Sequence, residues 1–221
     1  PQGMPAGWAP YRWGHWVWVA PWGWTWIDQS PWGFAPFHYG RWALIGGNWA
    51  WLPGAYTARP VYAPALVVWL GQPGWTVSFS FGSAPAVGWF PLGPREIYYP
   101  HYRSSLRHVR NINAHHVPNA PRIVTVTPPK DGPRYIPRDR HEAVTIVPEM
   151  TVLSGSPVHR TAAVEDNKAR SAAPITSSPT VVRERKPVQA MPPARPVPVP
   201  PAVAPMAPAL QKVAPPARNA A

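Results

Sequence analysis

The sequence predicts an all-β fold, a small antiparallel sheet or partly open barrel built from tandem tryptophan-rich β-hairpins and followed by a mostly disordered proline-rich tail. Three observations predict it. A tryptophan- and glycine-rich segment occurs twice. Short aromatic and β-branched runs are bounded by Gly and Pro, which is typical of strands. All 14 tryptophans lie between Trp8 and Trp89, so an aromatic, core-forming half precedes a half without tryptophan.

The repeat is visible in the letters of the sequence, and repeats of this kind indicate repeated structural units. Residues 9–16 (APYRWGHW) return as residues 35–42 (APFHYGRW), at an offset of 26. Residues 24–27 (WTWI) return as residues 49–52 (WAWL), at an offset of 25.

The one-residue difference between the two offsets falls at residues 20–23 and 46–48, which are both turn-forming strings. A length change confined to the turn is expected of two copies of a β-hairpin. The sequence therefore predicts hairpin repeats near residues 9–28 and 35–54.

The first strand of each copy is predicted at residues 15–19 and 41–45, where aromatic and β-branched residues cluster. Gly14 and Gly40 precede these strands at the same repeat position. A glycine at this point indicates a bulge or a close approach of another backbone segment. We expect both glycines to be structural residues.

A further pair of strands is predicted after the repeats. Residues 61–70 form an aliphatic run typical of a buried strand, and residues 75–81 alternate apolar with small polar residues. The turn-forming residues 71–74 join them. Six to eight strands are expected before residue 100, and their short connections favour antiparallel pairing.

Beyond residue 100, Ser104 or Ser105 is placed to cap a short helix that continues through Leu106, Val109 and Ile112. Such a helix would present its apolar residues on one face at helical spacing.

Two β-rich patches follow at residues 122–127 and 143–153, and no periodicity remains from about residue 167. The last 35 residues carry 11 prolines, which favours extended polyproline II conformations over a packed core. We therefore predict three regions: a hairpin module at 1–100, an extension with a short helix and weak strands at 101–165, and a disordered tail at 166–221.

Composition and charge restrict the function. The chain has no cysteine, which excludes disulfides and thiolate metal sites, and it has no apolar stretch of about 20 residues that could span a membrane as a helix. Its net charge of +12 is concentrated after Pro94. A basic half suggests nucleic acid or anionic membrane as partners. Because no run of five or six like charges is present, a dedicated nucleic-acid arm is disfavoured. Because the chain begins at Pro1, we expect a fragment or a processed form.

No catalytic constellation is found, so the sequence predicts a non-enzymatic protein without cofactors. The aromatic half offers one carboxylate, Asp28, and the histidines His15 and His38. A carboxylate pair for glycoside hydrolysis is missing there. Four histidines lie close together in the sequence without acidic or cysteine ligands at useful spacing, so we also predict no metal site; they are His101, His108, His115 and His116.

Alternation along the hairpin strands assigns the aromatic residues to faces. One face carries the residues expected to be core, which are Trp16, Trp18, Trp42 and Leu44. If Val19 opposes Trp24, and Ile45 opposes Trp49, the other face is exposed and forms a candidate ligand-binding stripe. Its members are Trp24, Trp26, Trp49, Trp51, Arg41 and His15. A one-residue bulge would reverse this assignment.

Several strings carry a family resemblance. Residues 7–16 (GWAPYRWGHW), 21–28 (PWGWTWID) and 31–42 (PWGFAPFHYGRW) are the most distinctive, with further matches at 59–66 and 88–96. Together they resemble a bacterial domain of unknown function that occurs in exported, proline-rich or FecR-domain-containing proteins. The likeness extends, more weakly, over roughly residues 5–165.

The resemblance implies an export signal and a FecR-like β domain upstream, and a periplasmic or secreted location at the cell envelope of a Gram-negative bacterium. It implies no activity. Together with the aromatic stripe, it leads us to expect an interaction or structural module that binds an envelope protein or polysaccharide, such as peptidoglycan. Two alternatives stay open: an electrostatic binder of nucleic acid or anionic membrane through the basic half, and a regulatory partner that docks on the FecR-like domain.

Overall fold

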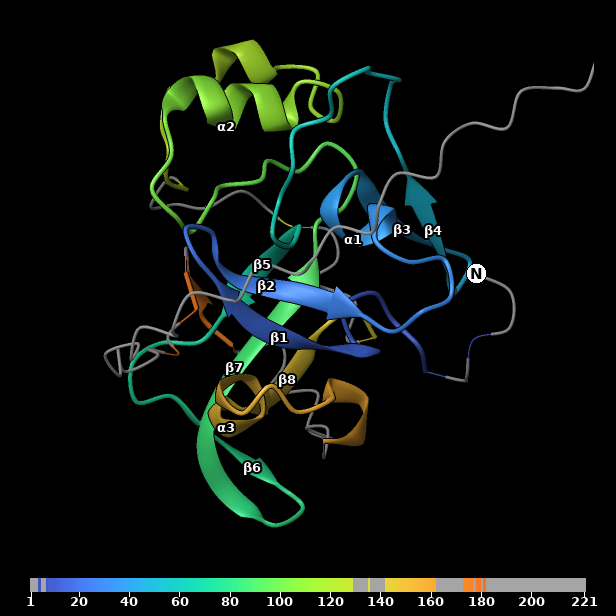
Figure 1. The fold of residues 1–221 in the computed structure, drawn as a ribbon. Helices are drawn as coiled ribbons and strands as arrows, with labels where there is room; N and C mark the ends of the chain where they lie inside the picture. Colours follow the sequence, from blue (N-terminus) through green and yellow to red (C-terminus); the bar gives the residue numbers. More distant parts are fainter. Residues whose placement is uncertain are drawn as a thin grey trace, which may run out of the picture. The chain divides into compact units, whose positions relative to one another are not determined.

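The protein is mostly β, with antiparallel sheets and a few short helices (Figure 1), so the predicted fold class is confirmed. Contacts divide the chain into two units, Pro1–Arg183 and Glu184–Ala221, and all described residues belong to the first. The computed structural model describes residues 4, 7–128, 135, 142–161, 173–176, 178–179 and 181. The predicted disorder of the tail at 166–221 falls almost entirely outside these residues.

The sequence repeat corresponds to two β-hairpins. In the first, β1 (Gly14–Val19) pairs with β2 (Gly23–Asp28), and in the second, β3 (Arg41–Ile45) pairs with β4 (Asn48–Leu52). Val19 opposes Gly23, which leaves a three-residue turn, whereas Ile45 opposes Asn48 across the two residues Gly46 and Gly47. The length difference between the copies therefore lies in the turn, as the offsets predict.

In each hairpin, the second strand packs closely against a glycine at the start of the first strand. This glycine is Gly14, the first residue of β1, in one copy and Gly40, just before β3, in the other. A Cβ atom on Gly14 would overlap the Ile27 carbonyl oxygen and the Trp26 ring. A Cβ atom on Gly40 would overlap the Leu52 carbonyl oxygen and the Trp51 ring, and Gly40 also has a φ of 77°. Because Trp51 and Leu52 are the repeat equivalents of Trp26 and Ile27, the close approach is the same in both copies.

The register of both hairpins differs by one residue from the expected one. Trp24 pairs with Trp18 rather than Val19, and Trp49 pairs with Leu44 rather than Ile45. A slip of one residue moves every side chain of a strand to the other face. The tryptophans of both strands of a hairpin therefore share one face, and the expected division into two tryptophan faces is wrong.

The other strands form a five-stranded sheet. Its order is β6–β7–β5–β9, with β8 also paired to β7, and all pairs are antiparallel. In β6, Val77 and Phe79 are buried while Thr76 and Ser78 are exposed, which agrees with the predicted alternation. Among the described residues before residue 100 there are seven strands, within the expected range. The strand bounds are β5 (Val67–Leu70), β6 (Thr76–Phe79), β7 (Gly82–Pro91), β8 (Thr145–Pro148) and β9 (Ile175–Thr176).

The predicted short helix is present as α2 (Leu106–Asn113), with the Ser105 hydroxyl accepting the His108 N–H at its N-terminus. Val109 and Ile112 face inward. The strand expected at residues 122–127 is wrong, because a 3₁₀ helix, η1 (Ala120–Arg122), occupies its start and the rest is irregular.

The patch at residues 143–153 is only half strand. Pro148 ends β8, and Glu149, a favourable residue in a first helical turn, begins α3 (Glu149–Leu153). A short helix before β3, α1 (Ala35–His38), and the 3₁₀ helix η3 (Val158–Arg160) were not expected.

An aromatic cluster forms the centre of the core. The Trp16 ring lies 5.2 Å from Trp26, 4.6 Å from Trp69 and 5.2 Å from Trp89, measured between ring centroids. These contacts pack the first hairpin against β5 and β7, which run beneath it in Figure 1. The second hairpin is attached through Trp42, whose backbone N–H donates to the Leu92 carbonyl oxygen at 3.0 Å.

Candidate functional site

The residues of the predicted binding stripe lie mostly inside the protein. Trp24 is 2% exposed, Trp26 0% and Trp49 6%, and Trp51 and His15 are half-buried. Three of the indoles also use their N–H internally. Trp24 donates to the Val181 carbonyl, Trp26 to the Asp28 carboxylate and Trp51 to the Tyr39 carbonyl. The expectation that this stripe is exposed is therefore wrong, because the register places its four tryptophans on the same face as Trp16 and Trp42.

Arg41 is also buried, at 2% exposure. Its guanidinium donates to the backbone carbonyls of Glu96 and Gly40 and to the Asn113 side-chain oxygen. Burial lowers the pKa of Arg41 to about 10, so it stays charged at neutral pH. These contacts tie the start of β3 to the segment before α2 and to the end of α2.

A different set of aromatic side chains reaches the surface, around α1. Pro36 lies in the first turn of α1, where proline is well tolerated. Phe34 and His38 are four residues apart and so lie on the same side of this turn. Their rings stack at 4.0 Å with 26° between the planes.

Tyr62 completes the stack from another part of the chain. The His38 ring nitrogen Nδ1 is 2.7 Å from the Ala63 carbonyl oxygen, and the Ala63 N–H donates to the His38 carbonyl. This pairing brings Tyr62 to 5.0 Å from His38 and to 5.9 Å from Phe34, with planes only 7° apart in the second case. Burial lowers the pKa of His38, which favours its neutral, stacking form.

Two more rings border this stack. Trp22, in the turn between β1 and β2, meets Tyr62 edge to face at 5.1 Å, and Tyr39 lies within 6.5 Å of Tyr62. Phe34 is 58% exposed although His38 and Tyr62 both stack against it, so a large part of its ring is open to solvent. We call this set the surface aromatic cluster; its members are Trp22, Phe34, Tyr39 and Tyr62, with His38 beneath.

The sequence patterns do not predict this cluster, because the repeated strings are dominated by tryptophan. One signal was available. Pro36 following a turn-forming segment indicates a helix start, and the i, i+4 spacing of Phe34 and His38 then places both rings together. The arrival of Tyr62 depends on a tertiary contact and has no local signal.

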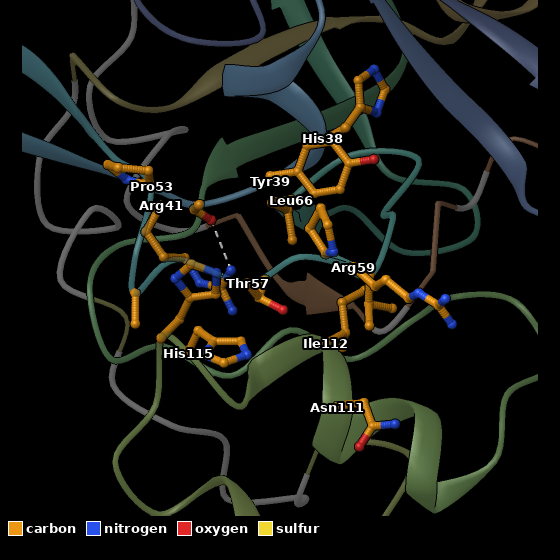
Figure 2. A pocket seen from close by; sticks show the side chains of 15 residues that line it. His38, Tyr39, Arg41, Pro53, Thr57, Arg59, Leu66, Asn111, Ile112 and His115 are labelled. Atoms are coloured by element: carbon orange, nitrogen blue, oxygen red, sulfur yellow. Dashed lines mark hydrogen bonds between the residues drawn. The ribbon is translucent and has the colours of Figure 1, made fainter.

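A pocket adjoins the cluster and shares His38 and Tyr39 with it (Figure 2). It lies between the loop after β4 and the end of α2, and its volume is about 60 Å³. Arg41 forms part of its wall, with its guanidinium held by the Gly40 carbonyl at 2.8 Å. The half-buried His116 ring packs against Gly54 on the same side.

In the part of the chain that the structure describes, none of the helices is long and apolar enough to cross a membrane. Nor do three or more of its histidine and acidic side chains come together in a group that could hold a metal ion.

The fold and the cluster define a tryptophan-rich, mostly β module with an exposed aromatic surface and a neighbouring cationic pocket. Residues 1–96 match a family model described as a family of unknown function (DUF6600). The match spans strands β1 to β7. It brings no activity with it. No curated protein and no solved structure matches the chain.

Proposed function

We propose that the protein is a non-catalytic interaction module that binds polysaccharide through the surface aromatic cluster. The exposure of the Phe34 ring, at 58%, carries this proposal. A flat ring that is backed by His38 and flanked by Tyr62 is held rigidly, so little conformational entropy is lost when a sugar ring stacks on it. Aromatic residues with polar edges, such as Trp22 and Tyr39, also offer hydrogen bonds to sugar hydroxyls.

We further propose that the module works at the cell envelope of a Gram-negative bacterium as part of an exported protein with a FecR-like domain upstream. This rests on the likeness of the tryptophan, proline and glycine strings to exported proteins. Peptidoglycan is then the first ligand to test. The complete open reading frame is the direct check, since it must contain an export signal for this proposal to stand.

Retention on purified sacculi and on insoluble polysaccharides tests the binding proposal. We expect the full chain to be retained and Phe34→Ala to lose most of that retention. Phe81→Ala is the matched control, because Phe81 is also exposed, at 64%, but lies at the turn between β6 and β7, far from α1 in Figure 1. Equal retention of the two variants, or no retention of the full chain, contradicts the proposal.

A second function is favoured by a separate observation. Residues 97–128 contain four arginines, Arg103, Arg107, Arg110 and Arg122, and no acidic residue. This region includes α2 and gives it a cationic surface suited to nucleic acid or anionic lipid. Such binding would weaken steeply with salt, because each phosphate contact releases counterions. Binding to DNA or anionic vesicles that persists unchanged at high salt would exclude this mode.

A further inference from the structure

The pocket beside the surface aromatic cluster has an unusual charge composition. Among the described residues that line it are two arginines and three histidines, and none of the 15 is acidic. The cationic and titratable members are Arg41, Arg59, His38, His115 and His116. A hollow with this lining attracts negative charge.

Arg41 supplies a buried positive charge, and its hydrogen bonds do not involve a charged acceptor. Its three acceptors are two backbone carbonyls and one amide oxygen, which are all neutral. A guanidinium has five N–H groups, so three bonds do not use all of its donors, and Arg41 is among the residues that line the pocket. Glu96 stabilises the charge through space, while its carboxylate accepts the Gly93 N–H at 2.6 Å.

Other donors surround the same space. Figure 2 shows the Arg41, Thr57 and His115 side chains gathered around the pocket, with Arg59 at its rim and its guanidinium directed outward. Arg59 is exposed and has a long flexible side chain, so it can turn toward a ligand. The pocket volume of about 60 Å³ is several times the roughly 10–15 Å³ that one water needs, so a small oxyanion fits.

Two features oppose an anion. The Glu96 carboxylate offsets part of the Arg41 charge, and the end of α2 carries partial negative charge, as helix C-termini do. Here the effect of the helix end is reduced. The Asn111 carbonyl accepts the Ala114 N–H, and the Asn113 carbonyl accepts the N–H groups of His116 and Val117. These hydrogen bonds offset part of the negative charge at the end of the helix.

We propose that this pocket is an oxyanion-binding site in which Arg41, Thr57 and the 115–116 histidines hold a carboxylate or a phosphate-type group, with Arg59 closing over it. The site is independent of the polysaccharide proposal. If both hold, the shared residues His38 and Tyr39 make the ligand an acidic glycan, with its sugar ring on Phe34 and its anionic group in the pocket.

His116 reports on occupancy directly. Burial, Arg41 and His115 lower its pKa to about 4, and an anion in the pocket would favour its charged form. We expect sulfate, which stays charged across the titration, to raise the His116 pKa measured by NMR on the full chain. Sodium chloride at the same ionic strength should not. Equal shifts in both salts would reduce the effect to screening and overturn the proposal.

Variants locate the site. Arg59→Gln and Thr57→Val should each weaken sulfate binding, Arg59→Gln about tenfold, while Arg107→Gln, an equal charge change on exposed α2 surface outside the pocket, should leave it unchanged. Equal loss in Arg59→Gln and Arg107→Gln would indicate general electrostatics and overturn the site.

Three ligands show which kind of anionic group the pocket binds. They also distinguish this proposal from the polysaccharide proposal. Sulfate tests a tetrahedral group, glucuronate a sugar carboxylate, and glucose a neutral sugar. Sulfate or glucuronate binding that survives Phe34→Ala supports the pocket even if polysaccharide retention fails. No binding of sulfate or glucuronate to the full chain would overturn it, whatever the sacculi show.

Discussion

Burying a charged arginine among neutral hydrogen-bond acceptors is destabilising. The side chain of Asn113 offsets part of this effect. Asn113 accepts from Arg41 and from the Tyr98 N–H, each at 2.8 Å. Its amide group also donates to the carbonyls of Tyr98 and Val109, at 2.9 and 2.7 Å. Each polar atom of this side chain therefore makes two hydrogen bonds, and a single residue joins β3, the 96–98 segment and α2.

This arrangement predicts a large effect of a small change. Asn113→Ala removes four hydrogen bonds and leaves a buried guanidinium N–H and a backbone N–H without acceptors, so it should lower the free energy of unfolding by about 2–4 kcal/mol. Denaturant unfolding measures it. Asn111→Ala, two residues away on the exposed side of α2, is the control and should change stability by less than about 0.5 kcal/mol. Similar losses would contradict the role of the network, because helix propensity favours alanine over asparagine at both positions.

The burial of His101 leads us to expect that the stability of the protein depends on pH. Burial lowers its pKa to about 4, and its Nε2 is buried without a hydrogen-bond partner among the described residues. The unfolded chain therefore takes up a proton at higher pH than the folded one. The contribution of neutral His101 is complete above about pH 6.5 and is lost as the pH falls toward 4.

We expect the melting temperature to fall between pH 6.5 and 4, and His101→Phe, which keeps a ring beside Trp69, to reduce that fall. The effect of His101 is on the order of 2 kcal/mol. His38 and His116 act in the same direction, while Asp28, whose pKa burial raises, acts in the opposite one. An identical pH profile for His101→Phe and the unchanged chain would contradict this.

At the scale of the elements, sequence patterns located most strands and both hairpins but not the hairpin register. Turn residues and the two offsets predicted both hairpins, and Ser105 predicted α2. The register escaped because Gly23 begins β2 instead of ending the turn, and Asn48 begins β4 in the same way. Nothing in local propensity distinguishes these alternatives. The choice depends on which face can be packed against the Trp69 and Trp89 rings, and that is tertiary information.

The corrected register reverses the expected energetics of the tryptophans. Trp24→Ala and Trp49→Ala should each destabilise by about 3–5 kcal/mol, as should Trp16→Ala, because all three are buried. Trp18→Ala should cost less than about 2 kcal/mol, since Trp18 is 46% exposed. Thermal melts of the four variants measure this. A small loss at Trp24 with a large one at Trp18 would restore the original face assignment.

At the scale of the whole molecule, segments after residue 100 belong to the same folded unit as the hairpins. The family match ends at residue 96, and composition predicts a boundary near 100. Yet β8 pairs with β7, and β9 pairs with β5, from far along the sequence. The central core also includes Val144, Ile146 and Val152. These contacts cover edges of β7 and β5 that residues 1–100 alone would leave open.

A truncation series therefore separates the family match from the folding unit. Residues 1–183 should unfold cooperatively with the melting temperature of the full chain, because residues 184–221 fall in a separate unit. Residues 1–100 should lose cooperativity or aggregate, since β7 loses β8, β5 loses β9, and Arg41 loses Asn113, which leaves unpaired strand edges and a buried charge with fewer partners. Calorimetry and size-exclusion chromatography of the three chains measure this. A cooperative, monomeric 1–100 fragment with the stability of the full chain would mean that the later segments only decorate an independent β module.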